Sequence, residues 1–170
     1  KVSVDGQPVT FDDIPQNFLR ESFVDIPDIG RATVLMIDTQ RADRTTRQHG
    51  IAWHVNNRLV GDCGWRGTDY ERVLDGRTSE AKRFTFIVFA DFLADNDAVL
   101  PDWSGFQPTN EIWKNTQIAV QDKIREEIAA FNSERRSETK EAVRERYAST
   151  VVRIAPIARE RWNSFVDQVI

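Results

Sequence analysis

The residues that could do chemistry in this sequence are few, and the clearest group is three carboxylates in one short stretch. Asp95, Asp97 and Asp102 follow an apolar run. Carboxylate oxygens are the ligands that hard cations such as Mg²⁺ prefer. The stretch lacks the glycine and terminal glutamate spacing of a calcium-binding loop, so we interpret it as a solvated acidic loop. The sequence therefore predicts no metal site here.

Histidine and cysteine offer little more. His49 and His54 are the only histidines, and no third ligand accompanies them at a metal-binding spacing. Cys63 lies near glycines without a base beside it, so we interpret it as a small apolar side chain. A phosphate-binding loop of the form G-x-x-x-x-G-K-[ST] is absent. We predict no catalytic residue, no enzyme activity and no nucleotide binding for this chain on its own.

Three arginines form a second candidate group. Arg41, Arg44 and Arg47 are spaced three apart in a polar stretch. Guanidinium groups bind phosphate bidentately, which favours a contact with phosphate or nucleic acid. The alternative is a solvated connection between two strands, and we prefer it because loops are generally polar. A net charge of -4 argues against nucleic-acid binding over the whole surface.

Length and composition are those of an ordinary globular domain. A chain of 170 residues can bury a real core. One cysteine cannot form an internal disulfide, so we expect the reducing environment of the cytoplasm. No apolar run is long enough to cross a bilayer, and we expect no membrane partner. Because the sequence opens at Lys1 and closes inside an apolar helical pattern, we expect a piece of a longer protein.

Strand signals surround the candidate residues. Alternating apolar residues on both sides of Asn56-Asn57 predict a β-hairpin, since asparagine tolerates positive φ. A third alternating run completes the pattern, and we expect all three to be neighbours in one sheet. A near-continuous apolar run before them predicts a central strand. In order along the chain, the expected strands are 32–37, 50–55, 58–60 and 84–92.

Other elements are expected before and between these strands. Asp5-Gly6 favours a small N-terminal hairpin, with strands at 2–4 and 9–11. The stretch 12–28 reads as a loop with a short helix near 16–21. A further short helix is expected at 68–74.

Helical signals dominate after a long loop at 94–107, which we expect Trp103 and Phe106 to anchor. A helix capped by Thr109 or Asn110 follows, with its apolar face ending at Phe131. The charged stretch 132–140 reads as a helix–helix junction or as an exposed helical extension. The remaining expected elements are a helix over 143–154 interrupted at Pro156, and a last helix from Ile157 with Trp162, Phe165, Val166 and Val169 inward.

Two of these stretches resemble a known domain. The segments H-G-I-A-W-H-V-N-N-R-L-V (49–60) and R-F-T-F-I-V-F-A-D-F-L (83–93) are similar to the transducer domain of the GHKL, or Hsp90-like, ATPases. The nearest likeness is to the microrchidia (MORC) proteins and their bacterial relatives. The resemblance implies an α+β fold, a two-layer ribosomal S5 domain 2-like sandwich of order β-β-β-α-β-α. On this interpretation residues 1–29 form an arm and linker, 30–131 the transducer and 132–170 a helical extension.

The resemblance also implies a function. Such a transducer is not catalytic, and it couples the nucleotide state of an ATP-binding domain of the same chain to downstream helices. ATP and Mg²⁺ are then expected for the parent protein and no cofactor for this piece, while a homodimer and nucleic-acid binding by the parent stay open. In the family a lysine on the loop after the last strand reaches the γ-phosphate. Loop 94–110 holds no lysine, so the nucleotide-sensing candidates are Gln107, Thr109, Asn110 and, one helical turn later, Lys114.

Overall fold

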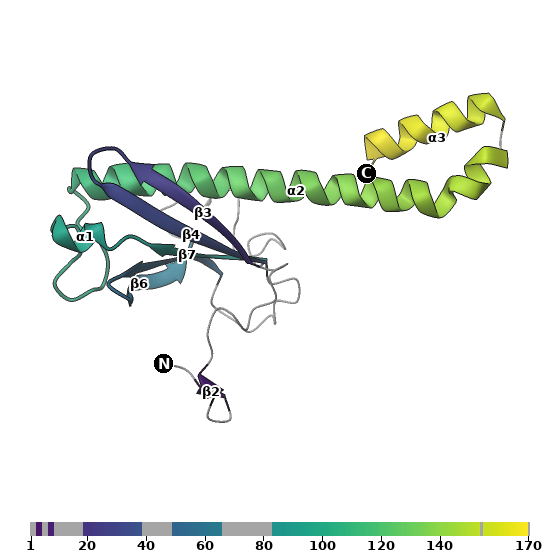
Figure 1. The fold of residues 1–170 in the computed structure, drawn as a ribbon. Coiled ribbons are helices and arrows are strands. Elements are labelled where there is room, and N and C mark those ends of the chain that lie inside the picture. Colours follow the sequence, from purple (N-terminus) through teal and green to yellow (C-terminus); the bar gives the residue numbers. More distant parts are fainter. Residues whose placement is uncertain are drawn as a thin grey trace. The chain divides into compact units, whose positions relative to one another are not determined.

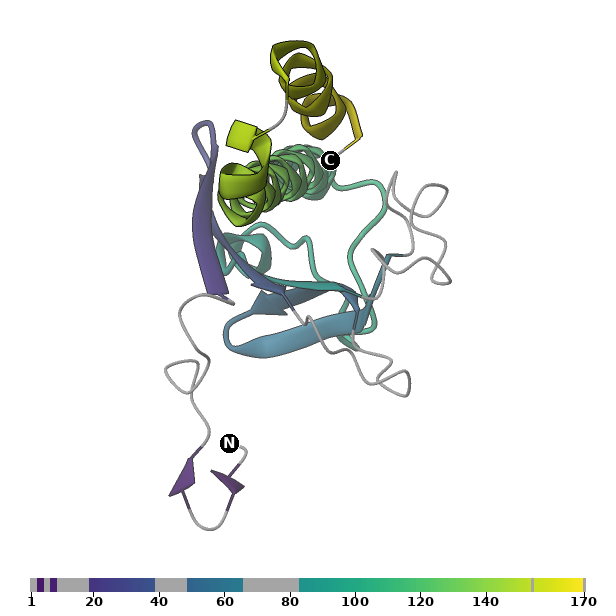
Figure 2. The ribbon, with the colours of Figure 1, turned by 90° about the vertical axis from the view of Figure 1, so that its right-hand side faces the viewer.

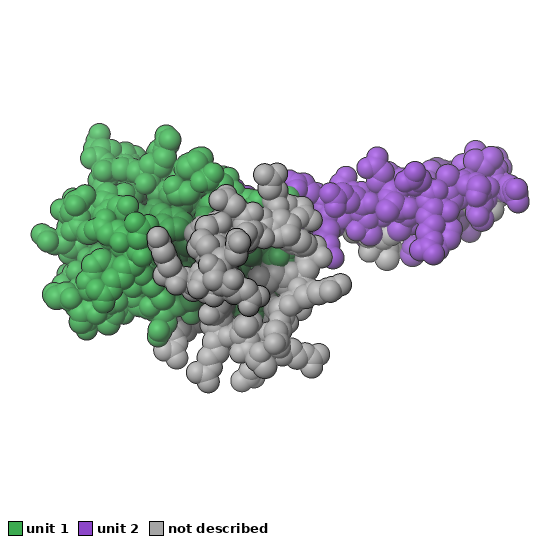
Figure 3. Space-filling view, turned by 60° about the horizontal axis from the view of Figure 1, so that its bottom comes forward, with its two compact units in different colours: residues 1–124 green, residues 125–170 purple. Residues whose placement is uncertain are grey.

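A computed structural model describes residues 3–4, 7–8, 19–38, 49–65, 83–153 and 155–169. The chain divides into two compact units, unit 1 (Lys1–Ile124) and unit 2 (Arg125–Ile170), which Figure 3 colours separately. Unit 1 contains the strands, and unit 2 is helical where it is described. The fold class is α+β, as the sequence predicts.

The described part of unit 1 is built on a five-stranded mixed sheet of order β3-β4-β7-β5-β6 (Figure 1). Only β5 and β7 run parallel; every other neighbouring pair is antiparallel. The three apolar runs are thus neighbours in one sheet, and the run at 32–37 lies inside it, which confirms both predictions. The strands are β3 (Leu19–Ile26), β4 (Gly30–Asp38), β5 (Gly50–Val55), β6 (Arg58–Gly64) and β7 (Phe84–Phe89).

Both ends of the β5–β6 hairpin depend on residues with positive φ. Asn56 and Asn57 have φ of 50° and 61°, and Val55 pairs with Arg58 across a two-residue turn. Two successive positive φ values match the twist of the flanking strands, so this predicted hairpin is confirmed. At the other end Gly50 has φ of 116°, and a Cβ on it would lie 2.3 Å from the carbonyl carbon of Gly64. Only glycine fits at position 50.

Strand β3 corrects the prediction of a loop with a short helix near 16–21. It pairs with β4 along its whole length, from Leu19 opposite Ile37 to Ile26 opposite Gly30. Inward Val24 and Ile26 alternate with exposed neighbours in its second half, as in a half-buried strand. The polar run Arg20–Ser22 follows Leu19 and weakens the local strand pattern, so the pairing with β4 decides the conformation.

The N-terminal hairpin is confirmed, but its second strand lies at 7–8, in the stretch expected to form the turn. Strand β1 (Ser3–Val4) pairs antiparallel with β2 (Gln7–Pro8). The strand expected at 9–11 and the short helix expected at 68–74 lie outside the described residues.

The core of unit 1 lies between the sheet and the first part of α2 (Glu111–Arg153), which runs along one face of the sheet (Figures 1 and 2). Val34 pairs with Val88 and Met36 with Phe86, so alternate residues of β4 and β7 share this face. The fully buried side chains here include Val34, Met36, Phe84, Phe86 and Val88 from the sheet and Thr116, Val120 and Ile124 from the helix. Burying each large apolar side chain contributes about 1.5–3 kcal/mol.

Helix α2 is continuous over 43 residues, so the charged stretch 132–140 is an exposed helical extension and not a junction. Helix α3 (Pro156–Val169) follows and starts with proline, which is suited to the first helical position. Val166 is fully buried as expected, but Phe165 is 50% exposed, so the prediction that it points inward is wrong. Within the described residues, none of the helices combines the length and apolar character that a membrane span requires.

Unit 2 is a helical hairpin closed by polar contacts. Arg144 Nη2 lies 2.6 Å from Asp167 Oδ1, and Lys140 Nζ donates to the Asp167 carbonyl at 2.9 Å. Near the other end, Arg159 donates to the carbonyls of two residues in the last turn of α2, at 3.3 and 3.0 Å. Each helix thus has its C-terminal carbonyls met by a cation of the other helix, which complements both helix dipoles.

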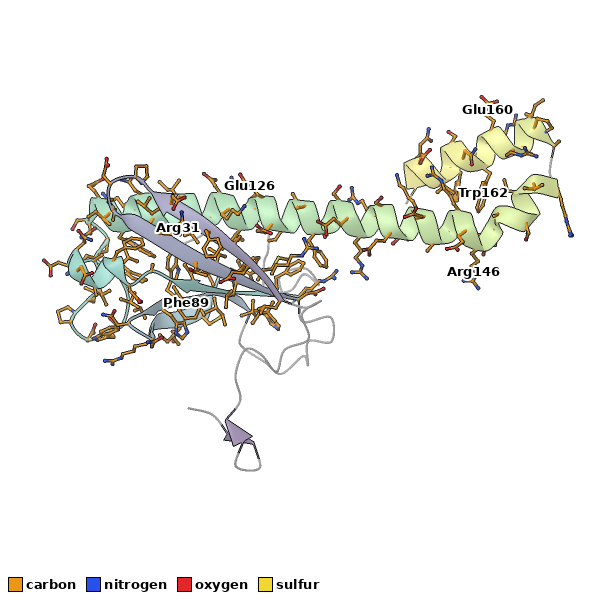
Figure 4. The ribbon with its side chains drawn as sticks, in the orientation of Figure 1. Arg31, Phe89, Glu126, Arg146, Glu160 and Trp162 are labelled. Atoms are coloured by element: carbon orange, nitrogen blue, oxygen red, sulfur yellow. The ribbon has the colours of Figure 1, made fainter. Side chains whose placement is uncertain are left out.

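An aromatic contact between the two helices adds to these polar contacts in unit 2. Trp162 lies between the two helices (Figure 4), with its ring 5.5 Å from that of Tyr147. The Arg146 guanidinium carbon lies 6.0 Å from the centroid of the same Tyr147 ring.

Candidate functional site

The candidate site is the loop that leads from the sheet into α2. After β7 the chain forms the short helix α1 (Phe92–Asp95) and then loop 96–110. The loop is closed by backbone pairing: Val99 bridges Phe106, and the Gln107 N–H donates to the Ala98 carbonyl at 2.8 Å. It therefore has a fixed base, formed by residues on both sides of its tip.

An aromatic trio fixes this base against the sheet. Phe106 stacks on Trp113 with ring centroids 3.8 Å apart and an angle of 12°. Trp53 of β5 meets both rings edge-on, at 5.7 Å from Phe106 and 4.8 Å from Trp113. Such pairs contribute about 0.5–1.5 kcal/mol beyond the area that they bury. The predicted anchoring role of Phe106 is confirmed.

Trp103 anchors the tip of the loop to the edge strand β6. Its carbonyl accepts a hydrogen bond from Gly61 N–H at 2.9 Å, and its ring lies 4.5 Å from the Arg58 guanidinium carbon. The backbone of Trp103 has φ of 62°. Sequence reasoning named Trp103 as an anchor but missed Arg58, because a pairing across such a distance in sequence leaves no local pattern.

Asn110 joins the loop to α2 through both ends of its side-chain amide. Oδ1 accepts a hydrogen bond from Trp113 N–H at 3.0 Å, and Nδ2 donates to the Asn96 carbonyl at 3.0 Å. The first contact makes Asn110, and not Thr109, the N-cap of the helix. A sensing role for Asn110 would have to compete with these two structural contacts.

The other nucleotide-sensing candidates lie beside this cap. Lys114 Nζ is 2.6 Å from Glu111 Oε1, in an ion pair whose side chains are 44% and 75% exposed. Thr109 is exposed, and Gln107 is partly buried with its backbone bonded to Ala98. Lys114 is the candidate that carries a charge, and its exposed ion pair is of the weak kind that exchanges readily for another partner.

Of the remaining sequence candidates, Asp97 and Asp102 lie within this loop. Arg41, Arg44 and Arg47 lie outside the described residues. The described residues contain no group of three His, Cys, Asp or Glu side chains that could hold a metal ion. Hydrogen bonds from Ser104 to Asp102 instead hold the pKa of that carboxyl below its usual value.

His54 and Cys63 respond to partial burial in opposite directions. Burial lowers the pKa of His54, whose ring lies 5.4 Å from that of Phe89, because the charged imidazolium is disfavoured. Burial raises the pKa of the Cys63 thiol, because the thiolate is disfavoured. Cys63 therefore stays a thiol at neutral pH, which agrees with its interpretation as a small apolar side chain.

A buried ion pair at the opposite end of the sheet was not anticipated. Arg83 donates to Asp38 through Nε at 2.7 Å and Nη2 at 2.8 Å, and the two side chains are 17% and 5% exposed. Each residue borders a buried strand in the sequence, which is the signal that could have suggested the pair. We interpret it as a structural link between the end of β4 and the start of β7.

The site thus consists of a hydrogen-bonded loop, an aromatic base, and a helix start that carries an exposed lysine. Lys114 is a cation at the start of α2, in its ion pair with Glu111. Comparison of the chain with protein-family models, curated proteins and solved structures gives no match.

Proposed function

We propose that this chain is the non-catalytic transducer domain of a larger Hsp90-like (GHKL) ATPase, with a ribosomal S5 domain 2-like fold. It couples the nucleotide state of an ATP-binding domain earlier in the same chain to the helices that follow loop 96–110. ATP and Mg²⁺ belong to that other domain, and the parent protein acts in the cytoplasm.

The observation that carries this proposal is the direct link between the loop and the long helix. One side chain, Asn110, is hydrogen-bonded both to Asn96 in the loop and to the first turn of α2. A displacement of the loop therefore acts on the start of the helix without an intermediate. Helix α2 continues without interruption to Arg153, so it is suited to carry the displacement onward.

The arrangement of the strands supports the finer fold assignment. Strands β4, β5, β6 and β7 stand in the spatial order β4-β7-β5-β6, with a tight hairpin and one parallel pair. Helix α2 covers one face of this sheet, which gives a two-layer arrangement. The order of strands along the chain agrees with the β-β-β-α-β-α pattern, apart from the additional edge strand β3 and the expected helix at 68–74.

Lys114 supplies the chemistry that nucleotide sensing requires. An ammonium group delivered to a γ-phosphate stabilises one arrangement of the domains only while that phosphate is present. The ion pair with Glu111 holds Lys114 near the loop and is exposed, so a phosphate can replace the carboxylate.

Calorimetric titration of this chain with Mg²⁺-ATP tests the first part of the proposal. We expect no binding heat, because the nucleotide site belongs to another domain. Clear ATP binding by the chain alone contradicts the assignment. A segment of the form E-x-x-x-N-x-x-D-A followed by D-x-G-x-G should be encoded upstream, and a parent gene without it also overturns the proposal.

Two lysine variants of the full-length protein test the sensing role. Lys114→Ala should lower the ATPase rate about 10- to 100-fold, as removal of a group that stabilises transferring phosphate does. Lys123→Ala, on the same helix, is the matched control and should stay within about twofold of wild type. Equal effects of the two substitutions rule out a specific role for Lys114 and leave the transducer assignment to the binding test.

A further inference from the structure

The tip of the loop, residues 100–105, is attached to β6 separately from the base of the loop. Trp103 provides both contacts described above: its carbonyl accepts from Gly61 N–H, and its ring meets Arg58. Within the tip, Leu100 N–H donates to the Gly105 carbonyl at 3.0 Å, and Trp103 N–H donates to the Leu100 carbonyl at 2.9 Å. The tip is thus a small hydrogen-bonded turn fastened at one residue.

The base is held by other residues. Phe106 stacks on Trp113, and Gln107 N–H is bonded to the Ala98 carbonyl. None of these contacts involves Trp103. The tip and the base of the loop thus contact the sheet through different residues.

Trp103 is strained in the tip as it lies on β6. Its φ of 62° lies in the left-handed region, which is costly for a bulky side chain. Opposite it, Gly61 has φ of 67°, and a Cβ there would lie 3.1 Å from the carbonyl oxygen of Ser104. Glycine at position 61 allows the close approach, and the strain falls on the tryptophan.

We propose that residues 100–105 form a strap that opens and closes on the outer edge of β6 while the base of the loop stays in place. Backbone strain at Trp103 favours the open state, and the contacts with Arg58 and Gly61 favour the closed state. β6 is the last strand in the sheet order, so opening leaves the Gly61 N–H available on an edge that an extended segment can pair with. This inference does not depend on the proposed nucleotide coupling.

A pair of substitutions at one position isolates the strain. Trp103→Gly and Trp103→Ala both remove the ring and its contact with Arg58, but only glycine adopts the left-handed conformation without strain. Amide hydrogen exchange of the intact chain, followed by NMR, should show the Gly61 amide exchanging at least tenfold more slowly in the glycine variant than in the alanine variant. Equal rates in the two variants mean that no strain is stored at Trp103 and overturn the proposal.

Removing the cation tests whether the strap moves independently of the base. Arg58→Ala should accelerate exchange at Gly61 about threefold, as expected for the loss of an exposed cation–π contact. Exchange at Gln107 and Trp113 in the base should stay within twofold of wild type, and protection of the Val88 amide in β7 verifies that the variant is folded. If the base amides accelerate as much as Gly61, the loop opens as one piece and there is no strap.

Discussion

The contacts inside unit 1 differ in kind from the contacts inside unit 2. In unit 1 the sheet and the first part of α2 enclose large side chains that are fully buried, such as Phe84 and Phe86. In unit 2, Val166 is the one apolar side chain that is fully buried among the described residues. Its helices are joined instead by Arg144, Lys140 and Arg159, which bind carboxylate or carbonyl oxygens near water.

From this difference we predict how the stability of each unit depends on salt and which unit unfolds first. Burial of apolar surface contributes about 25 cal/mol per Å² and depends little on ordinary salt. Contacts between exposed charges are weak and are screened at high ionic strength. A hairpin of two helices with little buried core is marginal by itself. Unit 1 should therefore unfold cooperatively, and unit 2 should open earlier and respond to salt.

The largest expected effect comes from the core of unit 1. Phe86→Ala removes a fully buried ring and should lower the free energy of unfolding by about 3–5 kcal/mol. Urea denaturation followed by circular dichroism measures this loss. Phe23→Ala is the control, because that ring is 52% exposed, and it should cost less than about 1 kcal/mol. Similar costs at the two positions contradict the buried core described for unit 1.

Substitutions at the buried ion pair test whether a charge contributes as much as packing to the stability of unit 1. Asp38→Ala leaves Arg83 without its carboxylate in a largely buried position and should cost about 3 kcal/mol. Replacing both residues, by Asp38→Leu with Arg83→Met, should recover most of this loss, because no buried charge remains. Thermal unfolding of the single and double variants measures both effects. A double variant as unstable as the single one shows that the pair contributes net stability.

A smaller effect, dependent on salt, is expected in unit 2. Arg144→Ala removes the contact with Asp167, whose side chains are about half exposed, and should destabilise the helical hairpin by about 0.5 kcal/mol in low salt. In about 1 M NaCl the difference from wild type should vanish, because the charges are screened. Amide exchange in α3 measures the effect, with the exposed Arg136→Ala as control. Salt independence of unit 2 removes the contrast between the units.

The smallest expected effect is a pH dependence from His54. Partial burial lowers its pKa in the folded state below the usual 6.5, so the unfolded chain binds the proton more readily. The contribution of His54 is fully present above pH 6.5 and is lost as the pH falls through the lowered folded-state pKa. The stability of wild type relative to His54→Gln should decline slightly over this interval in urea titrations. A difference that stays constant, or rises on acidification, is the opposite of this expectation.

The sequence predicts four of the five strands described in the sheet of unit 1, and it misses β3. Asn56-Asn57 identifies the hairpin, because few residue types adopt the positive φ that both positions of such a two-residue turn require. The apolar runs of β4 and β7 identify central strands. β3 was missed because its register comes from β4 and not from its own pattern. The continuous course of α2 through 132–140 could not be decided from a stretch without an apolar face.

The same contrast holds at the candidate site. The position of the loop, its aromatic anchors and a helix cap at Thr109 or Asn110 can be predicted from turn residues, aromatic residues and helix-start signals. The contact of Arg58 with Trp103 and the pair of Asp38 with Arg83 join residues distant in sequence, and only the folded chain brings them together. Local rules predict where a site lies, and tertiary packing decides which side chains meet there.

Gly50 has a consequence for finding relatives of this chain. Any side chain at that position would collide with the main chain of Gly64, and rotamer changes give no relief because the obstacle is backbone. Proteins that share this sheet should therefore keep a glycine at the first residue of the corresponding strand even when nearly everything around it has diverged. That glycine, followed by an asparagine pair at the hairpin turn, is a marker that distant homologues can be aligned on.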